Sequence, residues 1–334
     1  MIKKTSLKDI AHEAGVSIAL VSYVLNGKNT KRINVETAEK IKQIAKALNY
    51  QPNQIAKSLK SNKTYTLGLI VADISNFFYS YIAGHIEDEA NRFGYNVLFG
   101  SAYEDPKRFQ KLLDVMLARQ VDALILAIPD GAEDSLNTIK DSGVPFVLID
   151  REFPEFGELN SIVLDNYNAS ASVVRKFASL GCRKVAAIGL ESNLFHLQER
   201  SRGFTEIAEQ ILGPSTGKVY NLSEGSLPDK IQPLIKQILE EEQVDGICCF
   251  TNKIAMATLP LLLSLKVQVP KEITIICYDE VEAYKLFPYP MSFVRQPLEE
   301  MSKEAVRYLL GQDKHKVMGV RKFEAVLIDM QGYS

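Results

Sequence analysis

The sequence lacks any apolar run long enough to cross a membrane. A spanning helix needs about 20 consecutive apolar residues, whereas the longest runs here, Leu67–Ala72 and Leu259–Leu265, have the length of a strand or of a core helix. Secretory features are also missing, because Met1–Lys4 leads directly into polar, helix-forming sequence. We therefore expect a cytoplasmic protein without a membrane partner.

Cysteine and histidine are scarce and scattered. The four histidines, at positions 12, 85, 196 and 315, form no cluster. The four cysteines have no metal-type spacing, and three lie in strand-like runs, so buried free thiols of a reducing compartment are expected: Cys182, Cys248, Cys249 and Cys277. The patterns G-x-x-x-x-G-K-[ST], G-x-G-x-x-G after a strand, G-x-S-x-G and H-E-x-x-H are absent. These absences argue against an enzyme, a metal centre and a bound cofactor.

Charge is distributed unevenly along the chain. The 334 residues carry a net charge of −2, but residues 1–63 hold 12 Lys/Arg against 4 Asp/Glu, and the remainder holds 27 against 37. A basic head on an acidic body predicts that nucleic-acid contact is confined to the head.

Residues 6–15 have the pattern of a short capped helix. One apolar stripe recurs at the spacing i, i+3, i+4 and i+7: Leu7, Ile10, Ala11 and Ala14. Ser6 is placed as the N-cap with Asp9 three residues later, close to a capping box, and Gly15 suits the left-handed helix end.

A second short helix follows, with Ser17 as its N-cap. Its core-facing residues are Val21, Val24 and Leu25. Its opposite side is formed by Ala19 and Tyr23, with Ser22 beside them and Ile18 in the exposed first turn. Two short helices joined by a tight glycine turn form a helix-turn-helix, whose second helix can lie in a DNA major groove; an ordinary helical hairpin is the alternative.

A third helix is expected from Asn34 to Tyr50 and can close a three-helix core. Its apolar face comprises Val35, Ala38, Ile41, Ile44, Ala45 and Leu48. Basic residues at the N-terminus and in the loop after the second helix are candidates for contacts with DNA phosphates: Lys3, Lys4, Lys28, Lys31 and Arg32. Such contacts position a protein on DNA but do not specify the base sequence.

The pattern A-x-x-A-G-V-S-x-x-x-V-S-x-V-L-N, from Ala11 to Asn26, resembles the start of the lactose-repressor/galactose-repressor (LacI/GalR) family of bacterial transcription regulators. The resemblance implies a homodimer that binds double-stranded operator DNA. Family members often carry polar residues or arginine at the base-reading positions 18, 19 and 23, whereas two are apolar here, which leaves the operator sequence open. Apolar groups can contact thymine methyls, and a tyrosine can form one hydrogen bond. The expected DNA-contacting residues of this helix are Ser17, Ile18, Ala19, Ser22, Tyr23 and Asn26.

Residues 51–64 form a linker with room for a helix of about two turns after Pro52, which is marginal alone in water. By resemblance this is the hinge helix that folds on operator DNA. Leu59 would then wedge into a central minor-groove base step, with Asn53, Ala56 and Lys60 as further contacts. Packing of Leu59 on the following domain is the alternative.

From Tyr65 onward, apolar strand-like runs alternate with amphipathic helices. The first series is expected at 67–71, 78–92, 97–99, 107–119, 123–128, 135–142 and 146–149. The second begins after a strand at 161–164 and is expected at 169–180, 185–188, 199–212, 218–222, 227–242, 246–250, 255–265 and 273–277. The alternation predicts an α/β fold of two doubly wound parallel sheets. A ligand would bind between the two lobes at the carboxyl ends of the strands.

This region resembles the periplasmic-binding-protein-like (type I) core of the same family, in which the chain crosses between lobes three times. We expect crossings near Leu164–Asn166, near Phe293–Gln296 and in a last strand around Phe323–Ile328, with a helix Leu298–Leu310 returning to the first lobe. The expected domains are 1–50 for the helix-turn-helix domain, 51–64 for the hinge helix and linker, 65–164 with 297–322 for the N-terminal lobe, and 165–293 with 323–334 for the C-terminal lobe.

Several residues at predicted strand ends match the effector pocket of that family: Phe78, Tyr79, Asp150, Arg200 in R-S-R-G-F, Asn252 in C-F-T-N, Asp279 in I-C-Y-D-E and Gln296 in V-R-Q-P. Carboxylates, amides and an arginine can satisfy sugar-type hydroxyls, and an aromatic face can stack on a sugar ring. Structural roles are the alternative, such as a cap formed by Asp279 or a carboxylate partner for Arg200. Lys253 replaces the usual aspartate, which is compatible with an acidic effector or with a solvated lysine.

We therefore expect a ligand-responsive, sequence-specific transcription regulator, typically a repressor of carbohydrate-utilisation genes, controlled by a sugar or related metabolite. A solute-binding protein with an appended helical module, and an enzyme on a Rossmann-like core, are the rival hypotheses.

Overall fold

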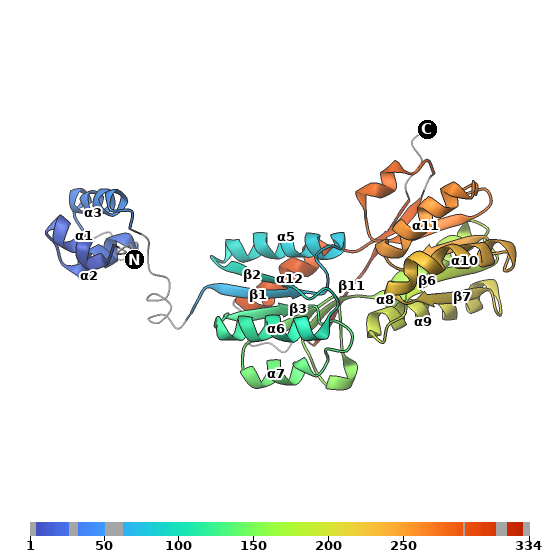
Figure 1. The fold of residues 1–334 in the computed structure, drawn as a ribbon, viewed down its shortest axis with the longest axis horizontal. Helices are drawn as coiled ribbons and strands as arrows, with labels where there is room; N and C mark the ends of the chain where they lie inside the picture. The colour runs from blue at the N-terminus through green and yellow to red at the C-terminus, as the bar shows by residue number, and fades with distance from the viewer. Residues whose placement is uncertain (1–4, 27–32, 51–62, 290, 312–318, 330–334) are drawn as a thin grey trace. The chain divides into compact units, whose positions relative to one another are not determined.

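The computed structural model describes residues 5–26, 33–50, 63–289, 291–311 and 319–329. It divides into two compact units, Met1–Thr64 and Tyr65–Ser334. Figure 1 shows a helical first unit and an α/β second unit, so the predicted fold class is confirmed.

The first unit contains three described helices, α1 (Leu7–Ala14), α2 (Ile18–Leu25) and α3 (Val35–Ala47). The predicted capping box is present, since the Ser6 side chain accepts from the Asp9 amide and the Asp9 carboxylate accepts from the Ser6 amide. Gly15 ends α1 with φ 70°, a left-handed conformation that glycine adopts without the steric cost of a Cβ atom. A small core joins the three helices and consists of Ile10, Ala11, Ala14, Val21, Val24, Ile41 and Ala45.

Two residues predicted on the apolar face of α3 lie outside this core. Val35 is 79% exposed because the Asn34 side chain caps the helix and places Val35 in its first turn. Leu48 is the C-cap residue and is exposed as well. The core stripe of α3 is therefore shorter than its sequence pattern predicts.

The second unit begins with a sheet of order β11-β5-β4-β3-β1-β2. Its strands are β1 (Thr66–Val71), β2 (Asn96–Ser101), β3 (Ala123–Leu126), β4 (Phe146–Ile149), β5 (Ser161–Leu164) and β11 (Val320–Phe323). Its helices are α5 (Phe77–Arg92), α6 (Pro106–Ala118), α7 (Ser135–Ser142), η2 (Pro154–Phe156) and α12 (Leu298–Leu310). We call this set the first lobe.

A second sheet follows, of order β12-β10-β9-β8-β6-β7. Its strands are β6 (Val185–Leu190), β7 (Gly217–Leu222), β8 (Gly246–Cys249), β9 (Thr274–Tyr278), β10 (Ser292–Arg295) and β12 (Val326–Asp329). Its helices are α8 (Asn166–Ser179), α9 (Phe195–Leu212), η3 (Glu224–Ser226), α10 (Leu227–Glu240), α11 (Asn252–Ser264) and η4 (Glu282–Leu286). We call this set the second lobe.

Helices cover both faces of each sheet, which explains the continuous apolar character of the central strands. In the first lobe α5 and α12 lie on one face and α6 and α7 on the other (Figure 1). In the second lobe α10 and α11 cover one face and α8 and α9 the other. The four cysteines are free and buried in this second lobe, as expected.

Within the described residues the chain passes between the sheets three times: between β5 and α8, between β10 and α12, and between β11 and β12. The last passage joins two strands, one in each sheet, where the sequence pattern had indicated a single strand. β11 is parallel to β5, whereas β12 is antiparallel to β10. No helix in the described part of the chain is long and apolar enough to span a bilayer.

Three helices of the second lobe begin earlier than their apolar patterns predict. The helix α8 begins at Asn166 because Asp165 caps it, and α11 begins at Asn252 because Thr251 caps it. The start of α9 moves to Phe195. These shifts bring His196 and Asn252 into the first turns of helices whose N-termini lie near the carboxyl ends of the strands.

Candidate functional site

The helix α2 presents an exposed face opposite its core contacts. Ile18 and Tyr23 are 48% and 44% exposed, and Ala19 is exposed between them. Ser22 is half-buried beside this face. The arrangement predicted for a recognition helix is therefore present: a small apolar surface with one phenolic hydroxyl.

Two predicted DNA-contacting residues hold the ends of α2. The Ser17 hydroxyl accepts from the Leu20 amide at 3.2 Å and caps the N-terminus. At the other end, Asn26 Nδ2 donates to the Ser22 carbonyl at 2.7 Å. Their side chains fix the length of the helix in addition to any contact with DNA. The predicted hinge residues Asn53, Ala56, Leu59 and Lys60 lie outside the described residues.

A cavity of about 210 Å³ lies between the two lobes of the second unit. Its wall includes seven carboxylates, Asp73, Glu104, Asp130, Asp150, Glu191, Glu224 and Asp279, and three cationic side chains, Arg151, Arg200 and Lys253. Six of the seven predicted ligand residues line it: Phe78, Tyr79, Asp150, Arg200, Asp279 and Gln296. Asn252 is buried between two lining residues, Thr251 and Lys253.

The first-lobe wall is centred on Asp150, which follows β4. Its φ of 71° places it in the left-handed region, where Asp is better tolerated than most residues. The Tyr79 hydroxyl donates to Asp150 Oδ2 at 2.7 Å, and Phe78 packs edge-on against the Tyr79 ring. Burial raises the pKa of Tyr79 well above its usual value, so its phenol is a neutral donor.

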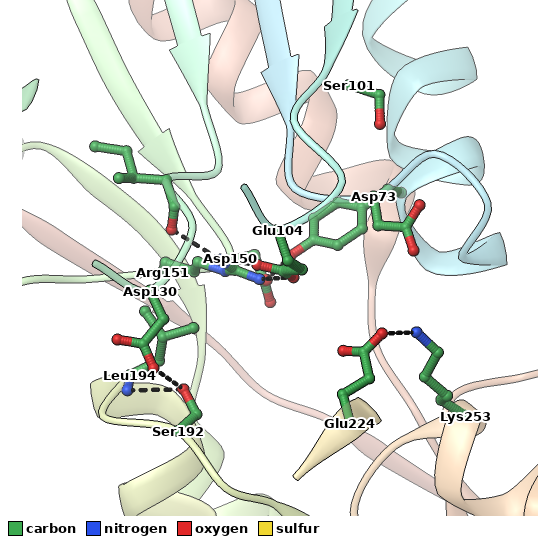
Figure 2. Close-up of polar contacts among 12 residues, drawn as sticks. Asp73, Ser101, Glu104, Asp130, Asp150, Arg151, Ser192, Leu194, Glu224 and Lys253 are labelled. Atoms are coloured by element: carbon green, nitrogen blue, oxygen red, sulfur yellow. Dashed lines mark hydrogen bonds and ion pairs between the residues drawn. The ribbon is translucent and has the colours of Figure 1, made fainter. Parts of the chain in front are cut away.

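Arg151 anchors the next part of this wall. Its guanidinium donates to both Glu104 oxygens, at 2.6 and 3.1 Å, and to the Ile128 carbonyl at 2.8 Å. Its Nε lies 3.7 Å from Asp150 Oδ2. Figure 2 shows this group of side chains converging from strands that are far apart in sequence. The charge of Arg151 is thus already balanced by protein carboxylates.

The second-lobe wall is built around Arg200 of α9. Its Nε donates to Asn166 Oδ1 at 2.7 Å, its Nη1 donates to the Phe250 carbonyl at 2.6 Å, and its guanidinium stacks 4.3 Å from the Tyr278 ring centroid. These contacts differ from the carboxylate pair that was one expectation for Arg200. They hold the guanidinium rigidly at the cavity wall.

Asp279, with φ 67°, follows β9 and is held by two donors. Gln296 Nε2 donates to Asp279 Oδ1 at 2.7 Å, and the backbone N–H of Asn252 donates to Asp279 Oδ2 at 3.3 Å. Burial raises the pKa of Asp279, and the nearby Arg200 opposes this rise. The Asn252 contact means that Asp279 also stabilises the first turn of α11.

Three buried polar atoms of cavity-lining residues form no hydrogen bond with a described residue: Gln296 Oε1, His196 Nδ1 and Arg151 Nε. Gln296 and His196 are only 6% exposed, and Arg151 is 4% exposed. Burial lowers the pKa of His196 well below its usual value, and Arg200 adds to this effect, so the imidazole is neutral. Buried unpaired polar atoms are costly, and a polar ligand would satisfy them.

The two lobes are joined on both sides of the cavity. Asp130 Oδ2 accepts from Ser192 Oγ at 2.9 Å (Figure 2). It also accepts from the backbone amide of Asn193 at 2.9 Å. Elsewhere Asn252 Nδ2 donates to Asn76 Oδ1 at 2.8 Å. Leu194 of the second lobe is buried in a core cluster of the first.

Lys253, in the first turn of α11, forms an ion pair with Glu224 at the start of η3 on the cavity wall (Figure 2). Neither sequence expectation for Lys253, an acidic effector or a solvated lysine, included this partner. The physical reason is the neighbouring placement of η3 and α11, which a local pattern does not reveal.

The sequence interpretation missed most of the polar wall, including Asp73, Glu104, Asp130, Glu191 and Glu224. Each follows the carboxyl end of a parallel strand, from β1, β2, β3, β6 and β7 respectively. Applying the strand-end rule to every strand, rather than only to motif matches, would have found them. No group of ligating side chains suited to a metal occurs among the residues that the structure describes.

Comparison with known proteins agrees with this architecture. The model of the bacterial regulatory proteins of the lacI family matches residues 6–53, and the model of the periplasmic binding protein domain matches residues 67–285. Catabolite control protein A of Staphylococcus aureus (strain Mu50 / ATCC 700699) is 28% identical over 305 residues, 91% of each chain.

Solved structures show the same fold. The lac repressor dimer bound to operator and the anti-inducer ONPF has a TM-score of 0.84 and 20% identity, covering 98% of this chain and 99% of that chain. The Cra transcriptional dual regulator from Pseudomonas putida, in complex with fructose 1-phosphate, has a TM-score of 0.70 and 23% identity, covering 80% and 99%. The chain belongs to the lacI family of bacterial transcription regulators, which are not enzymes, and it joins their helix-turn-helix domain to a periplasmic-binding-protein-like effector domain.

Proposed function

We propose that this protein is a repressor of carbohydrate-utilisation genes whose dimer binds a palindromic operator in the cytoplasm. A sugar or related metabolite in the interlobe cavity controls its affinity for DNA. The observation that carries the proposal is one chain with an exposed recognition face on α2 and a polar cavity enclosed by two lobes.

The DNA-binding part rests on residues of α2 and of the linker. Ser17, Ile18, Ala19, Ser22, Tyr23 and Asn26 are proposed to contact DNA from the major groove, and Asn53, Ala56, Leu59 and Lys60 from the minor groove. The exposed apolar groups on α2 favour contact with thymine methyls. The operator-bound dimer of the similarly folded lac repressor supports the same mode of assembly.

The ligand part rests on Phe78, Tyr79, Asp150, Arg200, Asn252, Asp279 and Gln296. Hydroxyl groups of a sugar can donate to the carboxylates and to the free Gln296 oxygen, while Arg200 donates in return. The name of catabolite control protein A and the fructose 1-phosphate bound to Cra both support a link to carbohydrate metabolism.

The proposed domain division is 1–50, 51–64, 65–164 with 297–322, and 165–293 with 323–334. The membership of β5 and α12 in the first lobe, and of α8 and β10 in the second, supports these boundaries. Phe323 belongs to β11 of the first sheet, so the last boundary fits best just after this residue.

Control of DNA binding follows from contacts on both sides of the cavity. Tyr79 and Asp150 belong to the first lobe, whereas Arg200 and Asp279 belong to the second. A ligand that touches both walls binds more tightly when the lobes are closed, and only this difference in affinity can shift the conformational equilibrium. The coupling to DNA affinity is typically 1–3 kcal/mol.

A genomic-fragment pull-down with the full-length protein at near-physiological salt tests the proposal. Retained fragments should share a palindrome next to sugar-metabolism genes, and a Tyr23→Ala variant should lose this enrichment. A Tyr81→Ala variant, which changes an exposed tyrosine of α5 outside the DNA-binding unit, is the control. Retention without any motif, disappearing as salt rises, would refute specific recognition.

A further inference from the structure

The interlobe cavity has a strong excess of negative charge. Seven carboxylates and three cationic side chains line it, and the fourth basic group, His196, is neutral because burial lowers its pKa. A sugar phosphate occupies the similarly folded Cra, so the fold itself does not exclude an anionic effector. The side chains of the wall must therefore determine which charge is accepted.

The cationic side chains of this wall are engaged by the protein. Arg151 is bound by Glu104 on both oxygens and lies close to Asp150. Lys253 is paired with Glu224. Arg200 donates to Asn166 and to the Phe250 carbonyl. Arg200 is thus the one lining cation that the described residues leave without a salt-bridged carboxylate, so it is the single lining cation available for a charge-assisted pair with a phosphate.

The unused polar atoms of the wall include two acceptors, in addition to the buried donor Arg151 Nε. Gln296 Oε1 is buried and accepts no hydrogen bond from a described residue. Asp150 uses Oδ2 for Tyr79 and for Arg151, and its Oδ1 accepts no hydrogen bond in the described part of the chain. Hydroxyl and ammonium groups donate to such atoms, whereas an ionised phosphate or carboxylate presents only acceptors.

We propose that the effector is an unphosphorylated, non-acidic sugar, and that the acidic wall with its internally paired Arg151 and Lys253 rejects sugar phosphates and sugar acids. This inference rests on the proposed ligand site and adds the charge class of the ligand. Glu224 is the proposed specificity-determining residue, because its pairing with Lys253 removes a cation that would otherwise attract an anion.

Matched ligand pairs test the inference by isothermal titration on the full-length protein. The probes are glucose with glucose 6-phosphate, fructose with fructose 1-phosphate, ribose with ribose 5-phosphate, glucosamine, and gluconate. At least one uncharged or amino sugar should bind, and its phosphorylated partner should bind about tenfold more weakly or worse. Equal or tighter binding of a phosphate or of gluconate would overturn the proposal, as would binding of none of the probes.

A variant locates the source of the selectivity. Glu224→Gln leaves Lys253 without its carboxylate, so the affinity ratio between a neutral sugar and its phosphorylated partner should fall several-fold. Glu282→Gln removes an exposed carboxylate paired with Lys285 outside the cavity and is the matched control. An unchanged ratio in Glu224→Gln would refute the role of this pair.

Operator binding is measured on the same preparations. Selective sugar binding without any sequence-specific DNA binding would refute the proposed regulator and leave the charge selectivity standing. Specific DNA binding that responds to a sugar phosphate would support the proposed regulator and refute the proposed charge selectivity.

Discussion

Gly203 offers the sharpest test of how the second lobe positions Arg200. The two residues lie one turn apart on α9, and a Cβ added at Gly203 would lie 2.3 Å from the Tyr167 carbonyl oxygen. That contact is with the backbone of α8, so a side-chain rotation cannot relieve it. The close approach of α8 and α9 also brings Asn166 to Arg200, where their hydrogen bond measures 2.7 Å.

The change Gly203→Ala should therefore lower the free energy of unfolding of the second unit. Forcing a methyl group into a packed contact costs typically 1–3 kcal/mol, and the better helix propensity of alanine returns at most about 1 kcal/mol. Because the obstructing atom belongs to the backbone, we expect a net loss of about 1–2 kcal/mol. Sugar affinity should also fall, since the shift separates Arg200 from Asn166.

Urea unfolding followed by circular dichroism measures the loss. Gly84→Ala on α5 is the matched control, because no atom lies within 4 Å of its added Cβ and it should raise stability by about 0.5–1 kcal/mol. If Gly203→Ala were as stable as Gly84→Ala, the close packing of α8 against α9 would be refuted as the reason for this glycine.

Three further substitutions test the two sites. Asp150→Asn keeps a residue that tolerates the left-handed backbone but removes the negative charge that accepts the Tyr79 hydrogen bond. Isothermal titration should show that sugar binding weakens about tenfold or more, the equivalent of a charged hydrogen bond. Unchanged sugar affinity would exclude a contact between Asp150 and the ligand. Asp130→Ala removes the bonds from the Ser192 hydroxyl and the Asn193 backbone amide, so amide exchange at Asn193 should accelerate and sugar affinity should fall about fivefold after allowance for solvent exposure. Unaltered exchange at Asn193 would show that the lobes are held by other contacts. Tyr23→Ala should reduce operator affinity by about 1–3 kcal/mol with little change on random DNA, measured by fluorescence anisotropy at fixed salt, and equal losses on both would make Tyr23 a nonspecific contact.

Local signals in the sequence determined the helical head. Caps depend on residues within one helical turn, and the structure shows each predicted cap: the capping box of Ser6 with Asp9, the helix end at Gly15 and the N-cap at Ser17. The exposed face of α2 followed from the same 3.6-residue period. Where a cap shifted a helix start, as Asn34 did, the pattern placed Val35 wrongly in the core.

The sequence also indicated the order of strands and helices in the second unit, because buried parallel strands read as short apolar runs. It placed Tyr79, Asp150, Arg200 and Asp279 at strand ends or on a following helix, and all four line the cavity. Motif matches supplied these residues, whereas the remaining strand-end carboxylates matched no motif and were missed.

Only the tertiary structure decided how the charges of the cavity are paired. Arg151 and Glu104 are 47 positions apart, and they meet because strands β2 and β4 flank β1 and β3 in one sheet and direct their ends to the same edge. Glu224 at the start of η3 pairs with Lys253 at the start of α11. Asn252 of the second lobe donates a hydrogen bond to Asn76 of the first lobe. Caps and periodicity depend on neighbours in sequence, so the sequence alone could predict them. The pairing of a charge depends on which strands are adjacent and how the lobes close, and that pairing determines the ligand that the cavity can accept.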